Sequence, residues 1–413
     1  MLYLTGISIS LFLSLLLVSK KNKTRADKIL TIWLFLLSFH LLIYYLSFSP
    51  YISKYPYLFG LHFPMPFLHG PFLYLYALAL TKKSPAFKTI NLLHFLPAVL
   101  FYMLFIPFFI QSLEDKTAIV QSGGKGFQPF YSLSIVALII SGIVYVILTS
   151  IRLHRHRISI LEQFSYTEKI NLWWLQYLTY GIGLIWLIII FSHDEVIFGA
   201  AAIFILFIGF FGIKQIGIFT QGNVFIEGYK ENSKIQFSGN SDIYQIFTTK
   251  NNISTNENNA DFSAENEGEI KKFKKYSKSG LTEESANQLH KLLKTKMDLE
   301  KLYIQTDLTL TTLAKRLNVP SNHLSQIINE KEGKNFYDYI NTLRINAFIE
   351  LISNSDNQKY TLLGLAFDCG FNSKSSFNKY FKKMTGISPS EYMDLKKTEK
   401  PTEITHSGDL YQS

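Results

Sequence analysis

The sequence predicts an all-α protein: a polytopic seven-helix transmembrane bundle, followed by a cytoplasmic domain of two helix-turn-helix units joined by a long linker helix. The first observation is a division in composition, because residues 1–220 hold long runs of Leu, Ile and Phe while the rest is polar and charged. The second is that apolar residues of the polar half recur every three or four positions, which is typical of amphipathic helices. The whole chain is 48% hydrophobic and 15% aromatic, high for a soluble protein.

The apolar half holds seven candidate membrane spans. A helix needs roughly 20 mostly apolar residues to cross a bilayer. The candidates are residues 2–18, 29–48, 57–80, 92–110, 130–151, 172–191 and 196–219. The third contains Pro64, Pro66 and Pro71, each of which removes a backbone donor and kinks or breaks a helix. If that segment does not span, every later segment is inverted.

The charges between these segments predict the orientation. Short loops rich in Lys and Arg stay on the cytoplasmic side. One set of alternate loops carries Lys20, Lys21, Lys23, Arg25, Lys28, Lys82, Lys83, Lys88, Arg152, Arg155, Arg157 and Lys169; the other carries only Lys54, Lys116 and Lys125. This bias requires an odd number of spans, with the N-terminus outside and the C-terminal half in the cytoplasm. No positive residue precedes the first apolar run, which favours a retained anchor over a cleaved signal peptide.

The apolar half shows little chemistry. His40, His62, His69 and His94 lie in or beside apolar segments, where an ionisable group is by default a functional candidate. A neutral histidine hydrogen-bonded between helices is the favoured alternative. The adjacent residues 193–195, "HDE", rarely suit one metal ion because they share one short turn. No metalloprotease, nucleophile-base or phosphate-loop motif is present, so we expect no enzyme activity, cofactor or metal.

Polar segments flank the second helical part. Residues 221–279 are rich in Asn, Ser, Glu and Lys, and we interpret them as a flexible polar linker. Its end, "KKFKKYSK", is interpreted as a solvated charge run, with contact to lipid or DNA phosphate as the alternative. Residues 399–413 are expected to be a disordered tail. Domain boundaries of 1–220, 221–279, 280–398 and 399–413 follow.

The polar half predicts two similar helix pairs. In the first, Thr309 caps a helix that "NVP" ends, and a second short helix starts near Ser321, which serves as a displaced cap after Pro320. In the second, Thr361 is the cap and Gly370 provides the positive-φ turn. The apolar stripes are predicted to be Leu310, Leu313, Ala314, Leu317, Leu324, Ile327 and Ile328 in the first pair and Leu362, Leu365, Ala366, Cys369, Phe377, Tyr380 and Phe381 in the second.

Three further helices complete this part. Residues 281–303 place Ala286, Leu289, Leu293 and Met297 near one face of a leading helix. Between the two pairs, Phe336, Ile340, Leu343, Ala347 and Leu351 follow the period of one long linker helix. Near the end, Ser388 and Glu391 predict a capping box with Pro389 at the first helical position.

These motifs resemble the DNA-binding domain of the AraC/XylS family of bacterial transcription regulators. The resemblance rests on "LAKRLNVPSNHLSQIIN", "YINTLRINAFIELI" and "GFNSKSSFNKYFKKMTGISPSEY", and it covers residues 307–395. Pro320 and Met393 depart from the family's usual residues, which leaves the entry angle of the first reading helix open. The fuller arrangement, with seven spans before the domain, resembles membrane-anchored AraC-type regulators of the Bacteroidetes.

The resemblance implies that each unit places one helix in the major groove of DNA. Residues opposite the apolar stripes are then candidates for reading bases, namely Asn322, Ser325 and Gln326 from the first unit and Lys374, Ser375, Asn378 and Lys379 from the second. Lys382 and Lys383 are assigned to phosphates. For each of these residues the alternative is plain solvent exposure.

The sequence therefore predicts a membrane-bound, sequence-specific, one-component transcription regulator in the cytoplasmic membrane. Its expected partners are double-stranded promoter DNA, the lipid bilayer, RNA polymerase and an unknown signal ligand or membrane partner. Confinement to a membrane raises local concentration and so favours pairing of two copies. The alternative is a transporter or channel with a DNA-binding or reporting cytoplasmic domain. A second alternative is proteolytic release of the soluble domain.

Overall fold

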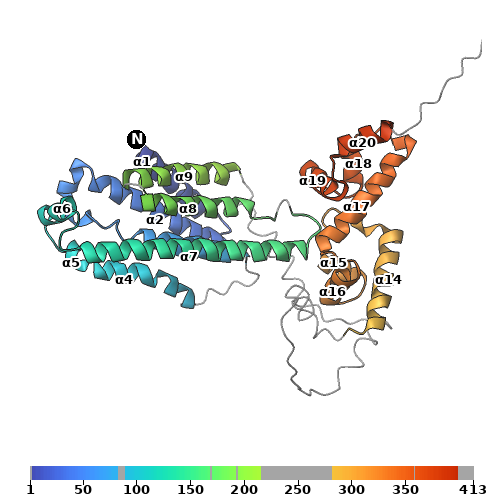
Figure 1. Ribbon diagram of the computed structural model, residues 1–413, viewed down its shortest axis with the longest axis horizontal. Coiled ribbons are helices and arrows are strands. Elements are labelled where there is room, and N and C mark those ends of the chain that lie inside the picture. Colours follow the sequence, from blue (N-terminus) through green and yellow to red (C-terminus); the bar gives the residue numbers. More distant parts are fainter. Residues whose placement is uncertain are drawn as a thin grey trace, which may run out of the picture. The chain divides into compact units, whose positions relative to one another are not determined.

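The computed structural model describes residues 2–81, 89–167, 170–191, 194–214, 281–357 and 359–398. These residues are helical, without any named strand among them. They form two compact units, drawn in Figure 1. The first holds the helices up to Arg157 together with those from Leu172, and the second holds Ile158–Asn171 and the helices from residue 283 onward. The predicted linker 221–279 and tail 399–413 lie outside the described residues.

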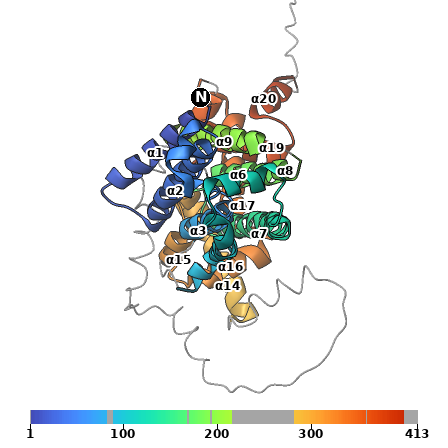
Figure 2. The ribbon, with the colours of Figure 1, turned by 90° about the vertical axis from the view of Figure 1, so that its left-hand side faces the viewer.

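The first unit is a bundle of apolar helices. It comprises α1 (Leu2–Ser19), α2 (Arg25–Ser47), α3 (Pro66–Thr81), α4 (Leu96–Leu104), α5 (Ile106–Phe109), α6 (Leu113–Gln121), α7 (Gln128–Leu161) up to Arg157, α8 (Trp173–Phe191) and α9 (Asp194–Lys214). Helix α1 packs on both α2 and α9, α3 packs on α2, and α8 packs on α9, as Figures 1 and 2 show. The α1–α2 corner is fixed by Thr24, which caps α2 in a capping box with Asp27, while Lys20 pairs with the same carboxylate at 2.8 Å.

Prolines interrupt two of the predicted segments. The helix expected over 57–80 begins only at Pro66, and short 3-10 helices at Pro50–Lys54 and Pro56–Leu58 precede it. The helix expected over 92–110 is divided into a 3-10 helix (Thr89–Phe95), α4 and α5. Both α4 and α5 have a proline in their first two positions, Pro97 and Pro107, where the missing amide costs no helical hydrogen bond.

Two helices of the described residues are long and apolar enough to cross a membrane, Arg25–Ser47 and Gln128–Leu161. Shorter apolar helices cover Tyr3–Ser19, Thr89–Leu104, Trp173–Ile189 and Val196–Phe207. A bundle of seven spans is therefore not confirmed by helix length and composition. Helix α7, with 34 residues, extends ten residues beyond the predicted end of its segment at 151.

Inside this unit the predicted histidines lie mostly against neighbouring side chains. Trp33 Nε1 donates to His69 Nδ1 over 3.3 Å, and His69 Nε2 lies 2.9 Å from His40 Nδ1. His94 Nδ1 lies 2.9 Å from the hydroxyl of Tyr145. Among the described residues no group of three His, Cys, Asp or Glu side chains is placed to hold a metal ion. His193 lies outside them.

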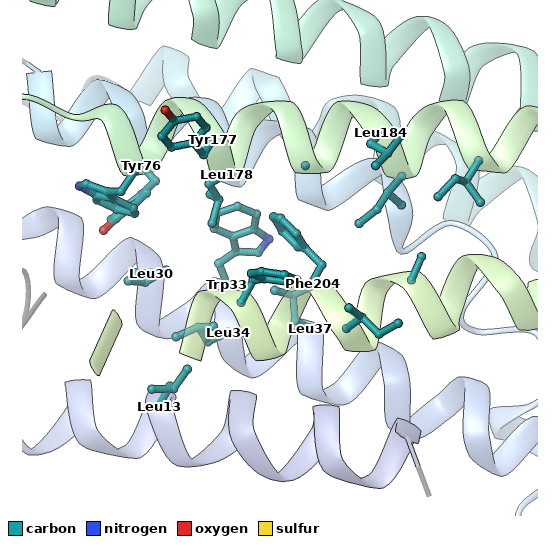
Figure 3. Close-up of a pocket in the computed structure, with 17 residues that line it drawn as sticks. Leu13, Leu30, Trp33, Leu34, Leu37, Tyr76, Tyr177, Leu178, Leu184 and Phe204 are labelled. Atoms are coloured by element: carbon teal, nitrogen blue, oxygen red, sulfur yellow. The ribbon is translucent and has the colours of Figure 1, made fainter. Parts of the chain in front are cut away.

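A cavity of about 450 Å³ lies between α1, α2, α3, α8 and α9. Figure 3 shows Trp33 and Phe204 facing it, with Tyr76 and Tyr177 nearby. Its lining is almost entirely aliphatic and aromatic, so the pocket suits an apolar molecule rather than an ion.

The second unit contains α14 (Glu283–Glu300), α15 (Leu310–Arg316), α16 (Ser321–Lys331), α17 (Phe336–Ser353), α18 (Leu362–Asp368), α19 (Lys374–Thr385) and α20 (Pro389–Thr398), with 3-10 helices at Leu302–Ile304 and Ser355–Asn357. The predicted face of α14 is confirmed, because Ala286, Leu289, Leu293 and Met297 are buried. The predicted capping box is also present: the Ser388 amide donates to Glu391 Oε2 over 2.7 Å, and the Glu391 amide donates to Ser388 Oγ over 3.3 Å.

Helix α17 belongs to two hydrophobic cores. Its first half, with Phe336 and Ile340, packs in the core formed with α14, α15 and α16. Its second half, with Ile345 and Phe348, packs in the core formed with α18 and α19. The predicted stripe continued through Leu343, Ala347 and Leu351, which are only partly buried. They still pack against the two cores, Leu343 against the first and Ala347 and Leu351 against the second, because the helix is covered from different sides along its length. The prediction of a long helix that joins the two helix-turn-helix units is confirmed.

Candidate nucleic-acid interface

The first helix-turn-helix unit consists of α15, a tight turn and α16. Thr309 caps α15 by accepting a hydrogen bond from the Thr312 amide over 3.1 Å. The turn uses Asn318 in the left-handed region (φ +55°), a conformation that Asn tolerates better than most residues. The predicted displaced cap is wrong: Pro320 is the N-cap residue, without a side-chain cap, and Ser321 is the first helical residue.

The outer face of α16 carries the first group of predicted base contacts. Asn322 is exposed and Ser325 is half-buried. Gln326 is buried, with 8% of its surface exposed, and its amide donates to Glu330 over 3.1 Å. Contact between Gln326 and a base would therefore require the side chain to leave this position.

The second helix-turn-helix unit consists of α18 and α19. Thr361 caps α18 by accepting from the Gly364 amide over 3.1 Å, and Ser373 caps α19 by accepting from the Ser376 amide over 3.1 Å. Gly370 makes the turn at φ +95°, as predicted. A Cβ there would lie 2.6 Å from the carbonyl oxygen of Ile304, so a side chain at this position would require the backbone to shift.

Helix α19 separates an apolar face from a basic one. Phe377, Tyr380 and Phe381 are buried in the second core, as predicted. The helix holds four lysines and no acidic residue. The predicted contact residues Lys374, Ser375, Lys379, Lys382 and Lys383 are exposed, while Asn378 is half-buried. A cationic face without acidic neighbours on its own helix is suited to the phosphates of DNA.

Lys383 has a partner within the domain. Its Nζ lies 2.6 Å from Asp338 Oδ1 on α17, and it also lies 5.3 Å from the ring centre of Tyr380. The Tyr380 hydroxyl donates to the carbonyl oxygen of Asp338 over 2.7 Å. Asp338 therefore fastens α19 to the start of α17. The sequence pattern gave no signal for this contact because the residues are about forty positions apart.

Lys315 and Arg316, at the end of α15, are exposed basic residues beside the first turn. They were not among the predicted contacts, because the resemblance implies one reading helix in each unit. Their basic charge next to a helix-turn-helix turn was the signal that could have indicated them.

The single thiol of the domain is a packing group. Cys369 is 2% exposed within the second core, and burial raises the pKa of its thiol to about 12. A thiol with so high a pKa is a poor nucleophile at neutral pH. This agrees with the predicted packing role.

Comparison with known proteins finds matches for the part of the chain that holds both helix-turn-helix units. Residues 313–394 match the family described as "Helix-turn-helix domain". The melibiose operon regulatory protein of Escherichia coli (strain K12) is 30% identical over 95 residues, which are 23% of this chain and 30% of that protein. Residues 313–394 form a helix-turn-helix domain of the AraC type.

An uncharacterized HTH-type transcriptional regulator of Staphylococcus aureus (strain COL) is 31% identical over 96 residues, which are 23% of this chain and 12% of that protein. The chain thus spans less than a third of the length of each of these relatives, in the region of the AraC-type domain. No solved structure gives a significant match. These likenesses are confined to the region of the helix-turn-helix domain.

Proposed function

We propose that this chain is a membrane-bound, one-component transcription regulator that transmits a membrane or extracellular signal to promoter DNA. The observation that carries the proposal is the presence, in one chain, of an AraC-type helix-turn-helix domain and a separate unit of strongly apolar helices. The apolar unit is the candidate sensor and the second unit the candidate effector.

The exposed surface of α7 supports a place in lipid. Leu133, Ile140 and Ile147 recur at intervals of seven residues, and each exposes more than half of its surface (56%, 57% and 52%). In water such an exposed apolar stripe would promote aggregation, whereas in a bilayer it would contact lipid acyl chains. We propose that α1, α2, α3, the interrupted 89–110 segment, α7, α8 and α9 make the seven crossings, with the N-terminus outside.

For the DNA contacts we propose that α16 and α19 enter successive major grooves, which lie about 34 Å apart on one face of the duplex. Asn322, Ser325 and, after its side chain turns outward, Gln326 read bases from α16; Lys374, Ser375, Asn378 and Lys379 read bases from α19. Lys382 and Lys383 contact phosphates. Phosphate contacts set the register of the protein, and base contacts set the sequence preference.

The test uses the full chain reconstituted in lipid nanodiscs. Its binding sites are first mapped across genomic DNA fragments, and the recovered sites are then footprinted. We expect protection over two successive major grooves and an affinity that falls steeply with salt. Absence of DNA binding, or binding that does not change with salt, would refute the proposal.

A pair of variants tests the assigned roles. Lys382→Ala should weaken binding to all sequences alike and reduce the slope of log affinity against log salt by about one. Asn378→Ala should instead relax the preference at one base position, at a cost of roughly 1–3 kcal/mol for the preferred base. If both variants have the same effect, the separation of roles is wrong.

The alternative is a transporter or channel whose DNA-binding domain reports its state. The apolar pocket of Figure 3 offers no charged side chain for an ion, but it could accept an apolar solute. Solute flux into vesicles that contain the chain would favour this alternative, whereas DNA binding without flux would favour the regulator.

A further inference from the structure

A short stretch directly after α7 is part of the DNA-binding unit. Residues 163–165, which we name the strap, pair with the chain just before α15. The Ser165 amide donates to the carbonyl oxygen of Leu308 over 3.2 Å, and the Leu310 amide donates to the carbonyl oxygen of Gln163 over 2.9 Å. This forms an antiparallel bridge between Phe164 and Thr309. The strap therefore holds the residue that caps the first helix of the first helix-turn-helix unit.

Side chains reinforce this pairing in the interior of the unit. Ser165 is 1% exposed, and its hydroxyl donates to the Leu308 carbonyl over 2.7 Å. Its own carbonyl oxygen accepts from Asn341 Nδ2 at 3.1 Å and from Arg344 Nη1 at 3.2 Å. Both donors belong to α17 and are buried, with 0% and 2% of their surfaces exposed. The strap is thus bound by the start of α15 and by α17 together.

The strap also contributes to the solvation of a buried cation. Arg344 donates through Nε to the Tyr303 carbonyl at 2.7 Å and through Nη2 to the Gln305 carbonyl at 2.7 Å, and it reaches the Ser165 hydroxyl at 3.3 Å. A buried guanidinium needs an acceptor for each donor, and removing acceptors leaves a costly unsatisfied charge. Both oxygen atoms of Ser165 therefore act as acceptors for Arg344. The strap is thus part of a buried hydrogen-bond network and does not merely touch the surface.

The strap follows α7 with one residue between them, since α7 ends at Leu161 and the strap begins at Gln163. A shift or rotation of the end of α7 must move the strap or release it. The strap belongs to the same compact unit as α15 and α17, and its pairing with residues 308–310 lies within that unit. The strap contacts the N-cap of α15 and also α17, the helix that belongs to both cores.

We infer that the 163–165 strap is an intramolecular docking element that couples α7 to the first helix-turn-helix unit, so that a change in α7 alters how the domain acts on DNA. This inference rests on the proposed function for its output, but the docking itself does not depend on DNA binding. The occupant of the surface formed by residues 308–310, Asn341 and Arg344 is the strap of the same chain.

Disulfide trapping tests the docking in the full chain. The hydrogen bonds flank the Phe164–Thr309 pair rather than join it, and in such a pair the Cα atoms lie about 4.5 Å apart, within the range that a disulfide spans. We would make Phe164→Cys with Thr309→Cys and insert a protease site between residues 221 and 279. After mild oxidation and cleavage, a docked strap keeps the two fragments joined on a nonreducing gel.

The matched control is Phe164→Cys with Thr361→Cys. Thr361 is the corresponding N-cap of the second helix-turn-helix unit, whereas the bridge of the strap is to Thr309. We expect the first pair to cross-link at roughly ten times the yield of the control, and Ser165→Pro, which removes the bridge amide and the hydroxyl, to abolish that difference. Equal yields in the two pairs would overturn the docking. A product that joins two chains would show instead that the surface binds the strap of a second copy.

Transcription from a mapped promoter tests the coupling. Ser165→Pro and the oxidised Phe164→Cys/Thr309→Cys chain should each change transcript level, in opposite directions and by roughly threefold or more, at equal amounts of protein in the membrane. Ser165→Ala keeps the backbone bridge and should give a smaller change than Ser165→Pro. If trapping succeeds but the locked and undocked chains both transcribe like the parent, the strap is only structural and the coupling is refuted. A chain that binds no DNA but still cross-links would refute the proposed function and leave the docking intact.

Discussion

Replacing Gly370 by alanine should destabilise the AraC-type domain by a predictable amount. The residue has φ +95°, and a non-glycine residue there costs about 1–2 kcal/mol. The new Cβ would also lie 2.6 Å from the Ile304 carbonyl oxygen and 2.8 Å from that of Tyr303. These are backbone atoms, so relief requires a backbone shift that costs about 1–3 kcal/mol. We expect a total loss of about 2–5 kcal/mol.

Gly386→Ala is the matched control. Gly386 also has a positive φ, +82°, but a Cβ there would meet no atom within 4 Å. Its substitution should therefore cost only the conformational part, about 1–2 kcal/mol. The difference between the two variants isolates the clash with the backbone at residues 303 and 304.

The lone thiol supplies an assay in the full-length chain. Cys369 is the only cysteine and is buried, so its alkylation reports opening of the domain. At equal denaturant, Gly370→Ala should be alkylated roughly 5- to 150-fold faster than Gly386→Ala, which corresponds to about 1–3 kcal/mol. Because Cys369 adjoins Gly370, hydrogen exchange in α16 provides a second readout. Equal alkylation rates and equal exchange in the two variants would refute the reasoning.

Three further outcomes follow from contacts of α19 and α20. Tyr380→Phe removes the hydrogen bond to the Asp338 carbonyl and should lower the free energy of unfolding by about 1 kcal/mol in the same alkylation assay. Lys383→Ala should weaken DNA binding less than Lys382→Ala, because Lys383 must first leave Asp338; a salt titration of both affinities checks this. Hydrogen bonding to the Ser388 amide lowers the pKa of Glu391, so its stabilising effect is present above pH 4.5 and is lost as pH falls through the lower folded pKa. Hydrogen exchange of α20 should show this loss in the parent chain and not in Glu391→Gln.

Local patterns predicted much of the DNA-binding unit. The caps at Thr309 and Thr361, the turn at Gly370 and the buried face of α19 each depend on residues within a few positions of one another, and periodicity detects such relations. The interruption of the 57–80 segment was expected from its prolines, and α3 begins at Pro66. The division of the 92–110 segment was not expected, and there Pro97 and Pro107 stand in the first turns of α4 and α5.

Contacts between distant residues were beyond the reach of these patterns. The Asp338–Lys383 pair and the bonds from Arg344 to Ser165 join residues 45 and 179 positions apart. Ser165 lies in what the sequence presents as an ordinary loop between two apolar segments. Arg344 lies in an amphipathic helix where a cation is normally solvent-exposed, so its burial depends on acceptors that come from other parts of the chain.

The sharing of α17 between two cores has a consequence for the DNA sites themselves. Because a single continuous helix cannot lengthen, α17 holds α16 and α19 at a fixed distance from each other. Each base pair inserted between the two half-sites turns one of them by about 35° around the duplex axis, which carries it away from its helix. If α16 and α19 read the two half-sites as proposed, the target promoters should differ in their bases but share one spacing. A promoter could then gain or lose regulation through point substitutions in its half-sites. A single insertion or deletion between the half-sites would instead abolish binding.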